Sequence, residues 1–476
     1  MREKFDKIVN SRFGRWADKY INTPWYSAAI AAVCILCHSL NIPVVGACLL
    51  TVLLVPALLF CNNSYVLVPF LLMCSFVVSE ETMPQTGHYN NVPSILFLCI
   101  ALACMVLALA FNIVYYGKWK RMFKRAYLTV PISLCSGVLI VGGLFSPTYT
   151  TSCLIMALPI ALTMYFPYSM MINCGEYKKE KTVTYFAYAM VAVVAVIAAA
   201  ILHRYAINDF DLTDPKSYCY FGYAGPNTSV AFVVIAIPMT FYLVCKYKHG
   251  YLFLLLVALE VLCTIATGSR AAQLVAIPGT LIVMIALCFK IKKGRIGYWI
   301  ITGIALVGVI AVAILLRGKI VEVFTNMANG NFGDSGRFSL WRQGFAAWKD
   351  NPIFGAGLTF LYSTDHWYYS FHCTPLTYLY CAGIIGFAAY VYHRYKTVRL
   401  VFSAKLTVGR VFVALSVLAM LCNALLDIAM TSPQHLLYYS IMLAIIEADV
   451  LNEKNEKSGS VETVKTSVAI DSESSV

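Results

Sequence analysis

The polar stretch between residues 317 and 372 contains three ionisable side chains that could do chemistry, namely Arg337, Arg342 and His372. A fourth, Arg270, lies at the tip of the short segment TGSRAA. A guanidinium presents a rigid fork of donors suited to phosphate oxygens. A neutral imidazole can accept a proton from a hydroxyl group. These residue types predict a site that holds a lipid-carried anionic group and activates an acceptor hydroxyl.

The two loop arginines differ in their expected positions. Asp334 or Ser335 can cap a helix that runs to about Lys349, which puts Arg337 in its first turn. Arg342 lies five residues further on, about 140° around the helix, so the two side chains cannot easily reach one point. We therefore favour Arg337 as the partner of Arg270. Arg342 is either a further substrate-binding residue or a surface charge, and Arg270 could also extend into lipid headgroups.

Two acidic residues, Glu260 and Asp427, interrupt apolar segments. A charge in such a segment is costly and usually faces a cavity or a partner. Asp427 is near the end of LCNALLDIAMTSP, where it could orient His372 or an arginine. Glu260 is in the middle of its segment, where a hydrogen-bonded packing role is expected.

Composition indicates which elements must position these residues. Hydrophobic residues make up 60% of the chain and charged residues 12%, and apolar runs of about 17–23 residues can cross a membrane as helices. We predict an all-α polytopic membrane protein with about 12–14 transmembrane helices and one large extracytoplasmic loop containing a short amphipathic helix. The apolar segments lie near residues 25–41, 43–60, 64–79, 93–115, 126–146, 149–172, 184–203, 228–245, 251–267, 271–289, 297–316, 374–393, 409–430 and 434–451.

The basic residues follow these segments. With a cytoplasmic N-terminus, 28 of the 36 Lys and Arg residues fall in the cytoplasmic connections and termini, as topogenic charge does. The net charge of +13 is thereby accounted for without a nucleic-acid partner. The predicted domains are a cytoplasmic N-terminal lead-in (1–24), transmembrane helices (25–316), an extracytoplasmic catalytic loop (317–372), three C-terminal transmembrane helices (373–451) and a disordered cytoplasmic tail (452–476).

Other residue patterns bear on packing and on cofactors. Trp341, Phe345 and Trp348 have the spacing of one helical face, which either lies on the outer leaflet or packs against the membrane helices. The 17 cysteines lie mostly in apolar runs without metal-ligand spacing, so they are expected to be packing residues. We expect no metal site and no cofactor.

Several motifs resemble the O-antigen ligase family. His372-Cys373, followed by nine residues, Gly383, two residues and Gly386, is similar to the ligase pattern, although Cys373 replaces a polar residue there. TGSRAA resembles the Ser-Arg turn of the family, SGRFSLWRQGFAAWKDNPIFGAGL resembles its loop motif, and GPNTSVAF, with Asn227, resembles a segment that opens a helix. The resemblance covers roughly residues 220–450. The chain has two more predicted segments before the loop than ligases usually have.

The resemblance implies a glycosyltransferase of the O-antigen ligase/polymerase superfamily in the bacterial cytoplasmic (inner) membrane. Its donor would be a saccharide on undecaprenyl diphosphate, its acceptor a glycan, lipid or protein, and it would need neither metal nor nucleotide. Arg270 and Arg337 would hold the diphosphate and His372 would deprotonate the acceptor. The further candidates for substrate binding are Arg342, Asn227, Asp427 and Trp341.

Two alternatives stay open. A ligase transfers the finished glycan to a different acceptor, whereas a polymerase transfers it to another repeat unit, and the same chemistry serves both. A transporter or a flippase for lipid-linked saccharides would also have many helices and an intramembrane acid such as Glu260. An obvious internal repeat, which many transporters have, is not evident in this sequence.

Overall fold

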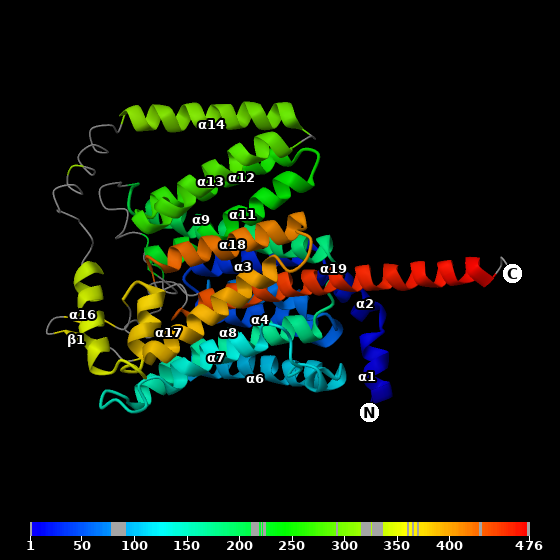
Figure 1. Ribbon diagram of the computed structural model, residues 1–476, viewed down its shortest axis with the longest axis horizontal. Coiled ribbons are helices and arrows are strands. Elements are labelled where there is room, and N and C mark those ends of the chain that lie inside the picture. Colours follow the sequence, from blue (N-terminus) through cyan, green and yellow to red (C-terminus); the bar gives the residue numbers. More distant parts are fainter. Residues whose placement is uncertain are drawn as a thin grey trace.

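The protein is a bundle of long α-helices (Figure 1). This computed structural model describes residues 2–77, 92–210, 219, 221, 225–291, 294–315, 325, 337–358, 361–363, 366–368, 371–427 and 431–473. Seven described helices are long and apolar enough to span a membrane, and the bent pair of α2 (Arg12–Ile21) and α3 (Pro24–Ser39) would be an eighth span. The prediction of an all-α polytopic membrane protein is therefore confirmed.

Each of the fourteen predicted apolar segments contains a helix. Several of these helices have only 10–17 residues. Fewer helices are therefore long enough to span a membrane alone than the number of apolar segments predicted. The helices in these segments are α3 (Pro24–Ser39), α4 (Pro43–Phe60), η1 and α5 (Ser64–Leu67 and Val68–Met73), α6 (Val92–Tyr115), α7 (Thr129–Val141), α8 (Thr151–Cys174), α9 (Glu180–Ile207), α11 (Pro226–Lys246), η4 and α12 (Gly250–Phe253 and Leu254–Ala266), α13 (Arg270–Lys290), α14 (Arg295–Leu315), α17 (Thr374–Val401), α18 (Val408–Ala424) and α19 (Pro433–Glu473).

The remaining elements are short and lie before or between these helices. Helix α2 is bent by 79° from α3, as expected for a lead-in that lies along the membrane surface. The strands β1 and β2 pair antiparallel, with Leu361 opposite Tyr368, and were not predicted from the sequence. The elements are α1 (Arg2–Val9), α2 (Arg12–Ile21), η3 (Lys118–Lys120), α16 (Arg337–Asp350), β1 (Leu361–Ser363) and β2 (His366–Tyr368).

Helix α11 is the central helix of the bundle. In its most apolar 18-residue stretch, 89% of the helix is buried. It packs against α9, α12, α13 and α18. A helix that is apolar on all sides requires such enclosure, and the apolar run from Val230 to Ile237 is buried accordingly. Its first residues, Pro226 and Asn227, are thereby fixed at one end of the bundle.

The two ends of the bundle carry different features. In Figure 1 the N-terminus and the C-terminus lie at the right, whereas α16 and the start of α17 lie at the left. Helix α16 and the start of α17 are therefore at the opposite end from both termini. This separation agrees with the alternation predicted from the basic residues.

Helix α19 covers part of the segment, residues 452–476, for which disorder was predicted. Helix α19 continues without a break from Pro433 to Glu473, and it extends beyond the bundle (Figure 1). Extending an existing helix avoids the cost of nucleating one, and Glu and Lys are good helix formers. Composition alone could not reveal that the preceding membrane segment supplies this nucleus.

Candidate functional site

His372 and Asp427 form a hydrogen-bonded pair at the loop end of the bundle. The His372 Nδ1 atom lies 3.0 Å from the Asp427 Oδ1 atom. The Asp427 side chain is 3% exposed and the His372 side chain 36% exposed. The carboxylate is thus enclosed by protein, whereas the imidazole lies at a surface that another molecule can reach. This arrangement suits a base that is oriented by an acid.

Helix α16 anchors the chain directly before His372. The Trp341 indole Nε1–H donates a hydrogen bond to the Phe371 carbonyl oxygen at 2.8 Å, and Gly344 packs directly against the Phe371 ring. His372 itself has φ = 47°, a left-handed backbone conformation that is uncommon for a residue other than glycine. The structure therefore gives Trp341 a positioning contact. The stripe predicted on α16 packs only in part, because Phe345 is 49% exposed.

The described part of α16 agrees with the helix predicted in the loop. Helix α16 begins at Arg337 and ends at Asp350, close to the predicted end at Lys349. Pro352 follows, and its carbonyl accepts a hydrogen bond from the Trp348 indole at 3.1 Å. The proposed caps Asp334 and Ser335 lie outside the described residues.

Gly383 interrupts α17 and creates a docking edge for the loop. Its φ of 64° and ψ of −159° are not helical, and this region is essentially restricted to glycine. Across the break, the Ala356 and Gly357 amides donate to the carbonyls of Tyr380 and Cys381, each at 2.9 Å. The Ile384 amide donates to the Pro352 carbonyl, also at 2.9 Å. The segment that follows α16, residues 352–357, is thus held against α17 by backbone hydrogen bonds.

The end of α7 joins the same backbone contact. The Gly143 amide donates to the Phe354 carbonyl at 2.7 Å, and a Cβ atom on Gly143 would overlap the backbone of Gly357. Thr148 donates its hydroxyl to the Ala356 carbonyl at 2.7 Å. Glycine is required where backbones approach this closely. These contacts hold residues 354–357, which follow α16, against the end of α7.

Helices α11 and α19 complete the surroundings of Asp427. The His435 Nε2 atom lies 3.1 Å from the Thr228 carbonyl oxygen, and the His435 ring stacks on Phe232 at 4.1 Å. Asp427 is close enough to His435 to interact with it electrostatically. Asn227, one residue before Thr228, therefore lies in the first turn of a helix that is tied to the neighbourhood of Asp427. His435 was not predicted from the sequence, because a single histidine in an apolar segment gives little signal.

The three arginines are at the same end of the bundle. Arg270 is the first residue of α13; it is exposed and follows Gly268, whose φ is 62°. Arg337 is the half-buried first residue of α16, and Arg342 is exposed. Helices α11 to α14 alternate in direction, so α13 begins at the end of the bundle where α11 begins. The structure brings His372 and Asp427 into contact and gathers the arginines at their end of the bundle. Among the described residues, no group of three or more metal-ligating side chains occurs.

An apolar groove of about 430 Å³ lies below these residues, between α11, α13 and α18. Leu425 and Leu426 line it and directly precede Asp427. Leu274 also lines it, one helical turn after Arg270. The groove therefore starts close to two of the polar site residues and continues into the part of the bundle that would lie in the membrane.

Together these features define a polytopic helical membrane protein in which the His372–Asp427 pair lies at the start of α17 and three arginines lie at the same end of the bundle. Residues 250–391 match the family model described as O-antigen ligase, and this match includes Arg270, Arg337 and His372. This match supports membership of the O-antigen ligase superfamily, a family of membrane enzymes of the ligase/polymerase type. No curated protein matches the chain. The resemblance predicted from the sequence motifs is confirmed. Asn227 and Asp427 lie outside the matched range.

Proposed function

We propose that this protein transfers a saccharide from undecaprenyl diphosphate to an acceptor hydroxyl, as an O-antigen ligase does. The reaction would take place at the outer face of the bacterial cytoplasmic membrane, in the synthesis of a cell-surface polysaccharide. The observation that carries the proposal is the His372–Asp427 pair, with a distance of 3.0 Å and an exposed imidazole edge. The superfamily assignment supports the reaction class.

The pair supplies the base. A carboxylate that accepts the Nδ1–H bond holds the imidazole in the tautomer whose Nε2 atom is basic. Nε2 then takes the proton of the acceptor hydroxyl as its oxygen attacks the anomeric carbon of the donor saccharide. The bond from that carbon to the diphosphate oxygen breaks, and the diphosphate leaves with the electron pair.

The arginines are proposed to bind the leaving group. Arg270 and Arg337 would hold the diphosphate and stabilise the negative charge that develops on it. Diphosphate is a good leaving group, so the reaction does not demand a general acid. Arg342 and Asn227 are further candidates for binding the substrate. Trp341 is proposed to act mainly by holding Phe371, and thus His372, in place.

The apolar groove between α11, α13 and α18 supports a lipid-linked donor. Its volume of about 430 Å³ can take part of a polyprenyl chain, and its walls begin one turn from Arg270 and beside Asp427. A lipid chain in the groove would leave its diphosphate at the level of these residues. This position would deliver the anomeric carbon to the exposed edge of His372.

A polymerase of the same superfamily is the second candidate. Cys373 favours it, because a cysteine stands where the ligase pattern has a polar residue. The proposed roles of His372 and the arginines are the same in both enzymes. The two differ in whether the acceptor is another repeat unit or a different molecule.

The test is an in vitro reaction with purified full-length protein and a labelled polyprenyl-diphosphate saccharide. We expect a new glycosidic bond, with release of polyprenyl diphosphate, when a suitable acceptor is present. Offering a second repeat unit or a different acceptor distinguishes polymerase from ligase. A transporter or flippase would relocate the donor between leaflets and form no bond, and that result would refute the proposal.

A further inference from the structure

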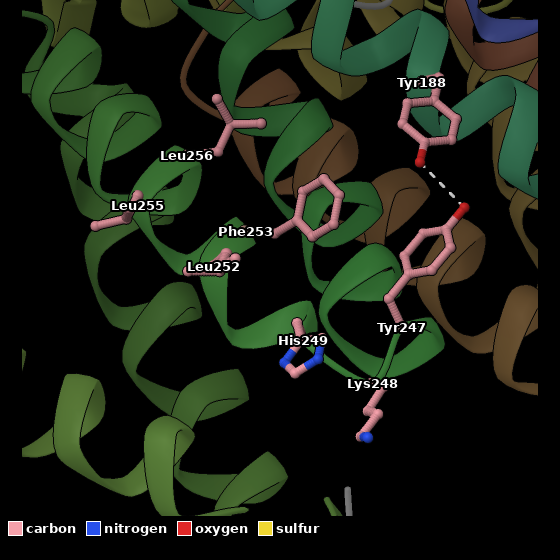
Figure 2. Close-up of a pocket in the computed structure, with 8 residues that line it drawn as sticks. All are labelled: Tyr188, Tyr247, Lys248, His249, Leu252, Phe253, Leu255 and Leu256. Carbon is pink, nitrogen blue, oxygen red and sulfur yellow. Dashed lines mark hydrogen bonds between the residues drawn. The ribbon is translucent and has the colours of Figure 1, made fainter. Parts of the chain in front are cut away.

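A second groove, of about 780 Å³, lies far from the candidate site. It is bounded by α9 on one side and by the turn from α11 into η4 and α12 on the other. The Tyr188 hydroxyl donates to the Tyr247 hydroxyl at 3.0 Å, and Figure 2 shows these two hydroxyl groups pointing toward each other at one side of the groove. Because α9 and the turn are linked by this bond, the groove has a fixed wall.

The position of the groove is set by the length of α11. Thr228 is in the first turn of this helix and contacts His435, whereas Tyr247 follows its last residue, Lys246. A 21-residue helix is about 30 Å long at 1.5 Å per residue, which is about the thickness of the hydrocarbon core. The groove therefore faces the leaflet opposite the candidate site, and it cannot hold the donor of that site.

One wall of the groove is apolar and exposed. Leu252 is 54% exposed and Leu255 66% exposed, although both are on an apolar helical stretch. The ring of Phe253 stacks on Tyr247 with centroids 5.9 Å apart, which makes the base of the groove rigid. Such a concave apolar wall on a membrane-facing surface fits an acyl chain.

The other end of the groove is basic. Figure 2 shows Lys248 and His249 at that end, with the leucines further along η4 and α12. The neighbouring Lys246 is paired with Glu180 at 3.3 Å, whereas Lys248 has no carboxylate partner within the part of the chain that the structure describes. Both Lys248 and His249 are exposed, so an anionic headgroup can reach them.

We propose that this groove binds one anionic phospholipid from the leaflet opposite the candidate site. An acyl chain lies along Leu252 and Leu255, and the phosphate contacts Lys248 and His249. The tyrosine hydroxyl pair offers polar partners at the level of the glycerol esters. The proposal does not depend on the chemistry of the candidate site.

Native mass spectrometry of the purified full-length protein tests this proposal with phosphatidylglycerol and phosphatidylcholine of identical acyl chains. Each basic residue near an anionic headgroup contributes roughly a fivefold gain in binding, so we expect at least that preference for phosphatidylglycerol. The double variant Lys248→Glu, His249→Ala should lose the preference. The matched control Lys120→Glu makes the same charge change on an exposed lysine in the connection after α6, and it should keep the preference.

Three results would overturn the proposal. Equal binding of the two lipids would mean that the groove does not recognise charge. A double variant that keeps the full preference would place the headgroup elsewhere. A loss of preference in Lys120→Glu as large as in the double variant would mean that net charge, and not this groove, selects the lipid. Transfer activity is measured separately, so its failure would not affect this test.

Discussion

Replacing Asp427 with asparagine should slow transfer without weakening donor binding. Asparagine preserves the shape of the buried side chain but removes its charge, and its amide NH2 could favour the wrong tautomer of His372. A hydrogen bond to a charged group contributes about 1.5–3 kcal/mol, so at 1.36 kcal/mol per tenfold in rate the loss should be about 10- to 150-fold. The assay is the initial rate at saturating donor, together with donor affinity, on the same purified preparation.

Glu260→Gln is the matched control for this prediction. Glu260 is also a buried carboxylate, and its Oε1 atom accepts a hydrogen bond from Thr240 at 2.6 Å, which the glutamine oxygen can still accept. This variant should keep the wild-type rate. A wild-type rate in Asp427→Asn would refute the orienting role of Asp427. A loss of donor affinity in proportion to the loss of rate would instead make Asp427 part of the donor pocket.

Three further predictions concern the two arginines Arg270 and Arg337, the break in α17 at Gly383, and the orientation of the chain in the membrane. Arg270→Ala and Arg337→Ala should each abolish transfer while the protein still accumulates in the membrane. Lysine at either position should restore activity only in part, because it lacks the bidentate fork of arginine. Full activity in both alanine variants would mean that the two arginines are only interfacial charges. Gly383→Ala should lower stability by at least about 2 kcal/mol, because alanine is strained at its positive φ and its methyl group would overlap a loop carbonyl; an unchanged thermal midpoint would contradict this account of the break in α17. A reporter fused near residue 245 should read cytoplasmic and one near residue 345 external, and a cytoplasmic signal from 345 would overturn the site assignment.

Most of the helices could be predicted because an apolar run long enough to cross a membrane has few alternatives to a helix. The proximity of Asp427 to His372 was also foreseeable, since a carboxylate near the end of an apolar segment needs a partner. Its Oδ1 contact with Nδ1 fits the orienting role expected for it. The predicted helix in the loop is present as α16, and it ends before Pro352.

The contacts that hold the loop could not be predicted. The Gly143 amide meets the Phe354 carbonyl through backbone atoms alone, so no side-chain pattern marks a pairing between residues so far apart in sequence. Gly383 was noticed as part of a motif, but its role as the break in α17 requires the fold. His435 gave no signal for the same reason, because its partner is the carbonyl of Thr228 on another helix.

The most direct test of the proposed mechanism is to measure transfer rate and donor affinity for His372→Ala. A general base typically contributes about 10²–10⁴-fold in rate, so turnover should fall by that factor. Donor affinity should be nearly unchanged, because the arginines are proposed to hold the diphosphate, and His366→Ala should be close to silent. If His372→Ala instead loses donor affinity in proportion to rate, His372 binds phosphate, and the acceptor must be activated by another group.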